Sequence, residues 1–444
     1  MKNTSVAFIA VFLLLCLAPS LGMLVFGPAQ ASANEILAAE PEPVNGDGGV
    51  NMEYLPQLAG YVSDRFWLRQ ELITLGRKLQ SAVFSSSGED SVILGQDGWL
   101  FYASTLGDYT GVEGLTEREL FAASRNLYLM NEYCRSIGVD FLFTAAPNKN
   151  SLYGAYMPAT GQVAETHDAQ RLYALLSAWN VPYLDLFEVF NAETETLYFA
   201  HDSHWTSRGA ALAADSINAA FGIESGYFSG AFSPQAHSGD LYEMLYPAGH
   251  DGEQDLVYTP AIQISYGSGG GTRPDSVTIN TTGSGEGVLL ACRDSFGNNL
   301  YPYLADSFAA ARFSRSTTYD LTLLSGLQAD CLLIELVERN LGYLLDYTPV
   351  LPCPERELPL PERRSGTLPI TVGSGSASGL TLCQGSLPLD IDADSPVYIV
   401  CEGQTFEALL GRRGFSAWLP EGSQPQLVLL YSQGELCALN AEIR

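Results

Sequence analysis

The chain has 444 residues, of which 50 are acidic and only 22 are basic, so its formal net charge at neutral pH is −28. A nucleic-acid partner is not expected, because binding to phosphates requires a basic surface. The length predicts two or three domains and allows a large hydrophobic core. The acidic residues are spread along the chain, which is typical of a solvated surface.

A mostly apolar run begins shortly after Lys2 and covers residues 6–26. It is long enough to cross a bilayer, which takes about 20 residues. The small residues Ala31, Ser32 and Ala33 form a pattern that signal peptidases cleave, so residues 1–27 are either a membrane anchor, which we prefer, or a secretory signal. In both cases we expect the body of the protein to be exported: anchored to the cell membrane with an extracellular domain, or secreted if the segment is cleaved. Residues 28–53 read as a linker.

The next part of the chain, residues 54–351, alternates between helical and strand patterns. Apolar residues at steps of three and four predict helices over 54–80, 116–137, 168–179 and 206–220. Short apolar runs predict a hairpin at 91–102 and strands at 139–145, 183–185, 287–292 and 330–336. Residues 222–285 are less regular and predict loops and short strands. Strands that alternate with helices predict an α/β fold, with a parallel sheet covered by helices on both faces.

The end of the chain has a different pattern. Residues 352–365 are rich in proline and predict a linker. Beyond them, apolar runs of strand length recur at 368–372, 397–400 and 427–431, and helical periodicity is almost absent. Residues 366–444 therefore predict a small all-β module.

Eight cysteines occur, seven of them outside the apolar N-terminal run, and none has the spacing of a zinc site. Cys134, Cys292 and Cys331 lie in apolar patterns that predict buried thiols. A single disulfide among the C-terminal residues remains open, since export permits one; the residues concerned are Cys383, Cys401 and Cys437.

Ser295 follows the apolar run 287–292 almost directly and precedes a segment that suits a helix. A serine at a sharp turn from strand to helix exposes its hydroxyl, but the hydroxyl is a weak nucleophile without a base. His204 is the candidate base, and Asp202, two residues earlier, is a candidate to hold its tautomer. Both stretches, like Lys149, come after predicted strands, where open α/β sheets bind ligands.

These residue types leave other interpretations open. The histidines are also compatible with plain polar positions in a loop. A metal site formed by His201, Asp202 and His204 is a further alternative, because histidine and aspartate both ligate zinc.

Seven blocks of the sequence, in this order, resemble the exported SGNH-like O-acetyltransferases of the alginate acetylation type, the AlgX and AlgJ group, and their Gram-positive relatives called DHHW proteins. The blocks are residues 63–69, 94–102, 146–149, 202–206, 239–241, 293–297 and 335–340. Together they extend over roughly residues 54–350. The C-terminal β module lies outside the resemblance.

The resemblance implies a three-layer α/β/α domain with a Ser-His-Asp triad. Matched position by position, Ser295 is the nucleophile, His204 the base and Asp202 the acid that orients it. The family block with Asn148 and Lys149 is implied to lie near the active site. The chain departs from the name-giving Asp-His-His-Trp motif at one position, where it has Ser203, which is not a position of the triad.

The neighbours of the nucleophile are candidates for substrate or oxyanion binding. Backbone N–H groups from Ser295 to Gly297 would stabilise an oxyanion, with help from the Asn148 side chain. Lys149 and Arg293 are further candidates for contacts with the substrate.

The expected function is extracytoplasmic O-acetyl transfer through an acyl-serine onto a hydroxyl of a cell-surface or secreted polysaccharide. The resemblance implies a membrane-bound O-acyltransferase as the partner that supplies acetyl groups, and it implies neither a cofactor nor a catalytic metal. An acetylesterase with the same triad, and a non-catalytic envelope or carbohydrate-binding protein, remain as alternatives.

Overall fold

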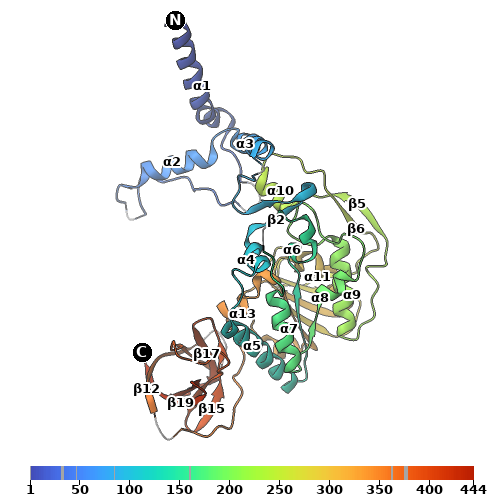
Figure 1. The fold of residues 1–444 in the computed structure, drawn as a ribbon, viewed down its shortest axis with the longest axis vertical. Coiled ribbons are helices and arrows are strands. Elements are labelled where there is room, and N and C mark those ends of the chain that lie inside the picture. The colour runs from blue at the N-terminus through green and yellow to red at the C-terminus, as the bar shows by residue number, and fades with distance from the viewer. Residues whose placement is uncertain are drawn as a thin grey trace.

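The computed structural model describes residues 2–31, 35–46, 48–84, 86–159, 162–361, 364–374 and 379–444. The N-terminal helix α1 (Lys2–Phe26) projects from one end of the molecule, the C-terminal β module forms the other end, and the α/β body lies between them (Figure 1). Two residues of the expected cleavage pattern, Ser32 and Ala33, lie outside the described residues, so the structure does not bear on cleavage.

The body is built on a seven-stranded sheet in the order β4-β3-β11-β9-β10-β8-β7. Its first five strands are parallel, and β8 and β7 form an antiparallel edge. The bounds are β3 (Asp140–Ala146), β4 (Tyr183–Leu184), β7 (Ser265–Tyr266), β8 (Thr278–Thr282), β9 (Val288–Cys292), β10 (Ala310–Ser314) and β11 (Cys331–Val337).

Helices cover both faces of this sheet. Strand β3 shows why: Phe141 and Phe143 join one core, whereas Leu142 and Ala146 join the other, because alternate side chains of a strand point to opposite faces. The first core is closed by α5 (Glu117–Ser136) and α7 (Asp168–Ala178), and the second by α8 (Leu186–Asn191), α9 (Ser207–Ala220) and α11 (Gly297–Ser307). The predicted three-layer α/β/α fold is confirmed.

Local signals placed several of these elements correctly. Thr116 and Glu119 form the capping box that begins α5, and the Thr206 hydroxyl accepts a hydrogen bond from Gly209 N at the start of α9. The predicted hairpin consists of β1 (Val92–Leu94) and β2 (Leu100–Tyr102), and its turn contains Asp97 with a positive φ of 53°.

The single helix expected over 54–80 was wrong. The structure has two helices, α2 (Tyr54–Arg65) and α3 (Arg69–Phe84), because Phe66 is extended and Leu68 has a φ of 62°. The break lets Trp67 donate a backbone hydrogen bond to Pro19 and stack on Phe26 of α1, with ring centroids 4.7 Å apart. Contact with another helix therefore outweighs the periodicity of the segment.

The region 222–285 holds short strands, as expected: β5 (Phe232–Ala236), β6 (Gln254–Tyr258), β7 and β8. It also holds the short helix α10 (Asp240–Leu245), which was not predicted. Strand β10, which lies between α11 and β11 and pairs with both β9 and β8, was not predicted from the sequence. The remaining short helices of the body are α4 (Leu106–Thr110), α6 (Lys149–Tyr153), α12 (Leu323–Leu327) and α13 (Tyr343–Asp346).

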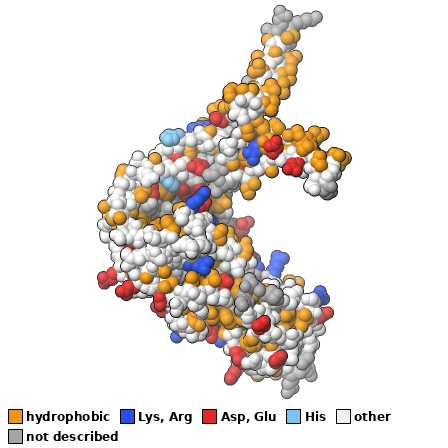
Figure 2. Space-filling view, turned by 180° about the vertical axis from the view of Figure 1, so that it is seen from behind, with side chains coloured by type: hydrophobic (Ala, Val, Ile, Leu, Met, Phe, Trp, Pro, Cys, Tyr) orange, Lys and Arg blue, Asp and Glu red, His pale blue; other side chains and the backbone are white. Residues whose placement is uncertain are grey.

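Hydrophobic side chains cover α1 where it projects from the body (Figure 2). Among the described residues, no single helix is both long and apolar enough to cross a membrane. One bent pair, Val6–Leu14 and Leu17–Phe26, meets the requirement by length and composition, with an angle of 42° between its halves.

The C-terminal part is all-β, as predicted. Its eight strands form one strongly curved sheet in the order β15-β14-β18-β19-β12-β13-β17-β16, which nearly closes into a barrel. Their bounds are β12 (Arg364–Ser374), β13 (Leu380–Ser386), β14 (Val397–Cys401), β15 (Gln404–Glu407), β16 (Leu409–Leu410), β17 (Gly414–Pro420), β18 (Pro425–Ser432) and β19 (Glu435–Ile443).

The β module packs directly against the α/β body. The Asn126 side chain of α5 donates to Leu410 O and accepts from Leu410 N, and the hydrophobic core of α5 continues into the module. In the proline-rich segment, Cys353 is buried and its N–H donates to Trp418 O. The expected domain boundaries stay a prediction, and Glu362 and Arg363 of the expected linker lie outside the described residues.

The seven cysteines beyond α1 are free thiols. The open possibility of a C-terminal disulfide was therefore wrong. Register explains the result: Cys437 lies opposite Leu430, Cys401 opposite Gln404 and Pro425, and Cys383 opposite Val372 and Ala417. Cys134, Cys292 and Cys331 are buried, as predicted.

Candidate active site

Ser295 lies in the short turn between the end of β9 and the start of α11. The carboxylate of Asp294 fixes this turn: Oδ1 accepts from Phe296 N at 2.9 Å, and Oδ2 accepts from Val337 N at 2.8 Å and from the Asn340 side chain at 2.7 Å. Asp294 thus ties the nucleophile turn to the end of β11.

His204 lies between Ser295 and Asp202. Its Nε2 is 2.8 Å from Ser295 Oγ, and its Nδ1 is 2.7 Å from Asp202 Oδ1. A carboxylate only accepts hydrogen bonds, so Nδ1 carries the proton and Nε2 presents a lone pair to the serine hydroxyl. This is the geometry that a general base requires. The structure thus brings together the three predicted residues.

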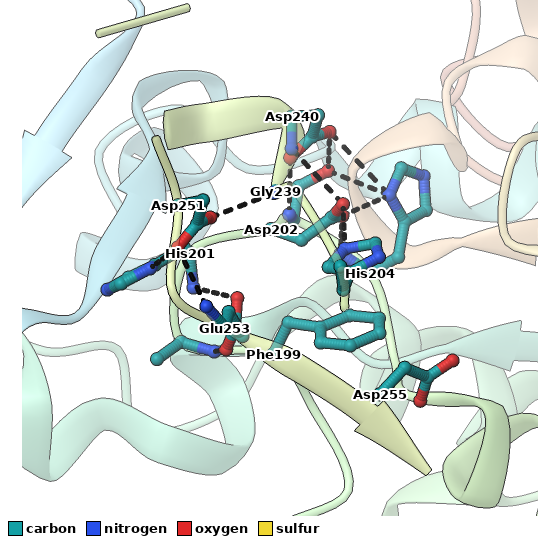
Figure 3. Close-up of polar contacts among 12 residues, drawn as sticks. Phe199, His201, Asp202, His204, Gly239, Asp240, Asp251, Glu253 and Asp255 are labelled. Carbon is teal, nitrogen blue, oxygen red and sulfur yellow. Dashed lines mark hydrogen bonds and ion pairs between the residues drawn. The ribbon is translucent and has the colours of Figure 1, made fainter. Parts of the chain in front are cut away.

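The Asp202 carboxylate is held from several sides. Besides His204, it accepts hydrogen bonds from His237 Nε2 at 3.0 Å and from Asp240 N at 3.1 Å. The contacts of Asp202 with His204 and Asp240 are drawn in Figure 3. Burial disfavours the charged carboxylate, but the hydrogen bonds and charges of the two histidines outweigh it and hold the pKa of Asp202 well below its ordinary value. Asp202 therefore remains an anion beside the base.

His237 and Asp240 are site residues that were not predicted from the sequence. Asp240 lies in the matched block 239–241, which was the available signal, whereas nothing in the local pattern indicated His237. Asp240 accepts from Ser203 N at 2.7 Å and from Ser203 Oγ at 2.6 Å. The residue that departs from the family motif, Ser203, is thus part of the hydrogen-bond network under the candidate base.

Asn148 and Lys149 lie at the start of helix α6. The Lys149 ammonium is buried and donates to the carbonyl oxygens of Phe199, Ala200 and Asp202, the last at 2.6 Å. Burial lowers the pKa of Lys149 to about 7. Lys149 therefore stabilises the loop that carries Asp202, because its ammonium group donates hydrogen bonds to backbone carbonyls of that loop.

Asn148 is fully buried, and its side-chain atoms have no hydrogen-bond partner among the described residues. It does not line the cavity beside Ser295. Its expected oxyanion role stays a prediction.

Arg293 and Gly297 shape the turn. The Arg293 guanidinium donates to Asn298 Oδ1 at 2.6 Å and to Pro274 O at 2.6 Å. A Cβ at Gly297 would lie only 2.2 Å from Arg293 Cδ, so only glycine fits beside the arginine stem. Both residues therefore determine the conformation of the turn, and their predicted contacts with a substrate stay predictions.

A cavity of about 340 Å³ opens beside Ser295. Its walls carry three arginines and three tyrosines, in spite of the strongly acidic composition of the chain. These residues are Arg293, Arg315, Arg339, Tyr102, Tyr319 and Tyr343. Asp294 also lines the cavity, and the three arginines against this one carboxylate favour a partner with anionic groups.

His201 belongs to a different group from His204. Its Nδ1 is 2.8 Å from Asp251 Oδ1, and its backbone N–H donates to Glu253 (Figure 3). His201 and His204 thus bind different carboxylates, since His201 binds Asp251 and His204 binds Asp202. The three residues considered as one metal site fall into two groups, because His201 lies with Asp251 and Glu253, whereas Asp202 and His204 lie with Asp240.

A mostly parallel sheet covered on both faces, with Ser295 just after β9 and the loop of His204 and Asp202 in contact with it, defines an SGNH-like α/β domain. Comparison with protein families agrees: residues 92–254 match the family described as SGNH hydrolase-like domain, acetyltransferase AlgX. The resemblance inferred from the seven blocks is confirmed, and it supports an enzyme of the acetyltransferase class. The matched stretch contains Asp202 and His204 and ends before Ser295.

Solved structures show weaker likenesses. PatB1 of Bacillus cereus shares 16% sequence identity at a TM-score of 0.44, with 56% of this chain and 96% of that chain covered. A DHHW family protein from Eubacterium siraeum shares 16% identity at a TM-score of 0.41, with 55% and 89% covered. AlgX of Pseudomonas aeruginosa shares 12% identity at a TM-score of 0.36, with 79% and 95% covered. No curated protein matches the chain.

Proposed function

We propose that this protein is an extracytoplasmic O-acetyltransferase that moves an acetyl group through Ser295 onto a polysaccharide hydroxyl. The observation that carries the proposal is the position of His204, which is 2.8 Å from Ser295 Oγ and 2.7 Å from Asp202 Oδ1. The family match of residues 92–254 supports acetyl transfer as the reaction.

In the first half of the reaction, His204 Nε2 takes the proton from Ser295 Oγ while the oxygen attacks the carbonyl carbon of an acetyl donor. The tetrahedral intermediate collapses when His204 returns this proton to the leaving group of the donor, and acetyl-Ser295 remains. Asp202 stabilises the imidazolium that forms between these two proton transfers.

In the second half, a sugar hydroxyl attacks the acetyl carbon of the acyl-serine. His204 takes the hydroxyl proton and then returns it to Ser295 Oγ as the ester of the sugar is released. In both halves, backbone N–H groups from Ser295 to Gly297 are the proposed donors to the oxyanion. The positively charged cavity favours an acceptor that carries carboxylate or other anionic groups.

Acetyl donors of the cytosol do not cross a membrane unaided. The proposal therefore includes a membrane-bound O-acyltransferase as the partner that delivers acetyl groups, and it gives the apolar N-terminal segment the task of keeping the domain at the membrane. What supports this role is the composition of residues 6–26 and the exposure of large hydrophobic side chains among them, such as Phe8, Leu14 and Leu24.

The test of the acyl-serine is incubation with an activated acetyl ester, followed by intact-mass analysis. We expect a mass increase of one acetyl group in the unaltered protein and none in Ser295→Ala. The variant Ser316→Ala, which changes another serine of the same cavity, should retain the adduct. An adduct that survives Ser295→Ala would contradict the proposal.

An acetylesterase is the second candidate, because water and a sugar hydroxyl compete for the same acyl-enzyme. Product analysis with an oligosaccharide acceptor separates the two: acetylated oligosaccharide supports the transferase, and free acetate alone supports the esterase. A non-catalytic carbohydrate-binding protein, the third candidate, would bind glycans and turn over no acetyl ester.

A further inference from the structure

Three side chains outside the candidate active site converge on one point. They are Asp108 in α4, His167 just before α7, and Glu338 directly after β11. His167 Nδ1 lies 3.9 Å from Asp108 Oδ2 and 3.9 Å from Glu338 Oε1, and all three atoms lie within 4.8 Å of one another. Residues far apart in the sequence thus direct one nitrogen and two oxygens into a common space.

These three atoms are buried, and none of them has a hydrogen-bond partner among the described residues. The Glu338 side chain is fully enclosed, and those of Asp108 and His167 are 14% and 13% exposed. A buried polar atom without a partner destabilises the fold, so three such atoms in one place indicate a missing partner that satisfies all of them.

The placement of the two carboxyl groups bears on the nature of this partner. Glu338 Oε1 and Asp108 Oδ2 lie in the same buried space, on either side of His167 Nδ1. Two carboxylates that face each other without a cation repel, and either a bound cation or a proton shared between them relieves the repulsion. A histidine nitrogen between the two carboxylates favours the cation, because a neutral imidazole is a good metal ligand.

The second oxygens of both carboxyl groups accept hydrogen bonds, an arrangement that also occurs around metal ligands. The second oxygen of Glu338 accepts from Asn148 N at 3.0 Å and from Ser151 Oγ at 2.6 Å, and the second oxygen of Asp108 accepts from Asp168 N at 3.3 Å. Such bonds orient a ligating carboxylate and leave its other oxygen free to bind.

We propose that Asp108, His167 and Glu338 form a binding site for a divalent transition-metal ion, with zinc as the ion to test. One nitrogen and two carboxylate oxygens suit zinc or manganese better than calcium or magnesium, which take oxygen ligands. Ligand atoms stand about 2.0–2.2 Å from zinc and therefore about 3.3–3.6 Å from one another, so the three atoms here, which lie 3.9 Å and up to 4.8 Å apart, would move closer together to bind one.

The site lies next to the elements that hold the triad. Glu338 binds Asn148 N at the start of α6, and the next residue, Lys149, holds the Asp202 loop. The turn that begins with Glu338 also carries Asn340, which donates to Asp294 under the nucleophile turn. An ion here would stabilise both the Asp202 loop and the nucleophile turn, although its three ligands do not line the cavity beside Ser295.

Metal content of the full-length protein, purified in detergent and stripped with a chelator, tests this inference. After zinc is added and the excess removed, elemental analysis should find one ion per chain in the unaltered protein. The variants His167→Ala and Asp108→Asn should bind zinc at least tenfold more weakly. The matched control is His201→Ala, which alters a histidine of similar surroundings whose carboxylate neighbours Asp251 and Glu253 have hydrogen-bond partners.

Zinc should also raise the unfolding temperature of the unaltered protein and leave that of His167→Ala unchanged. His167→Ala is the decisive variant, because His167 lies partly exposed at a helix end. Glu338→Gln would also disturb the hydrogen bonds of Glu338 with Asn148 and Ser151. No retained zinc in the unaltered protein would overturn the inference and favour the shared proton. Full retention of zinc by His167→Ala would also overturn the inference. Loss of zinc in His204→Ala would overturn it too, since the ion would then bind at the candidate active site.

Discussion

His237 Nε2 lies 3.0 Å from Asp202 Oδ2, so the carboxylate that orients the candidate base is shared by two histidines. The ring of His237 stacks on Phe199, with centroids 3.9 Å apart, which fixes its direction. Asp202 therefore cannot rotate away from His204 without losing a second partner. The orienting acid is preorganised before any substrate binds, which is a condition for efficient general-base catalysis.

The variant Asp202→Asn tests the orienting role. An amide can keep most of the hydrogen bonds, but it neither holds the His204 tautomer nor stabilises the imidazolium, so we expect kcat to fall by roughly a thousandfold or more while the fold persists. Kinetics with an activated acetyl ester measure this. Asp251→Asn, which removes the partner of His201, should lose far less activity, and equal losses in the two variants would count against the triad.

His237→Ala removes one charged hydrogen bond to Asp202, a contact worth about 1.5–3 kcal/mol in typical proteins. We expect kcat to fall by roughly tenfold and KM to change little, because His237 acts through Asp202. His237→Gln, which can still donate to the carboxylate, should recover part of the loss. Failure of the glutamine to recover any activity would indicate a role other than positioning.

The same pair predicts a pH dependence of stability. Burial disfavours a charged His237, but the hydrogen bond and charge of Asp202 outweigh it and raise the pKa of His237. Its contribution to the free energy of unfolding is complete below the unfolded pKa of about 6.5 and is lost as pH rises through the raised folded value. The stability difference between the unaltered protein and His237→Ala should therefore be larger at mildly acidic pH than at alkaline pH. Chemical denaturation at several pH values measures it, and a difference that grows with pH would contradict it.

Gly297→Ala should damage the nucleophile turn, because the added Cβ would meet the Arg293 side chain at 2.2 Å from Cδ. We expect lower stability and a loss of acyl-serine formation. Gly60→Ala is the control: Gly60 lies inside α2, a Cβ added there would meet no atom within 4 Å, and alanine should stabilise that helix by about 0.5–1 kcal/mol. Thermal unfolding of the two variants, followed side by side, should shift in opposite directions.

Much of the fold and of the site followed from local patterns. The capping box at Thr116 placed α5, and the strand-to-helix turn at Ser295 indicated the nucleophile. What could not be predicted depends on contacts between distant segments. The break at Leu68 follows from packing against α1, β10 is a short strand paired between β9 and β8, and His237 reaches Asp202 from a loop 35 residues away.

The junction between the α/β body and the β module gives the last prediction. The buried carboxylate of Glu407 accepts from Arg125 Nε at 2.5 Å and Nη2 at 2.8 Å, both from α5, and from Arg356 Nε at 2.8 Å. Glu407→Gln leaves the Arg125 guanidinium without its anion, whereas Arg356 keeps its pair with Glu132. Because the arginine side chains are partly exposed, we expect a cost of about 1.5–3 kcal/mol, as for the loss of a charged hydrogen bond.

The control at the same junction is Arg412→Gln, since Arg412 is 41% exposed and its bonds to Asp346 and Glu119 lie at the surface. That variant should lose no more than about 1 kcal/mol. Limited proteolysis should cut Glu407→Gln faster in the segment 352–361 than it cuts the unaltered protein, because the module would separate from α5 more often. Equal cleavage and equal stability in Glu407→Gln and Arg412→Gln would show that the apolar contacts around α5, rather than this ion pair, hold the module in place.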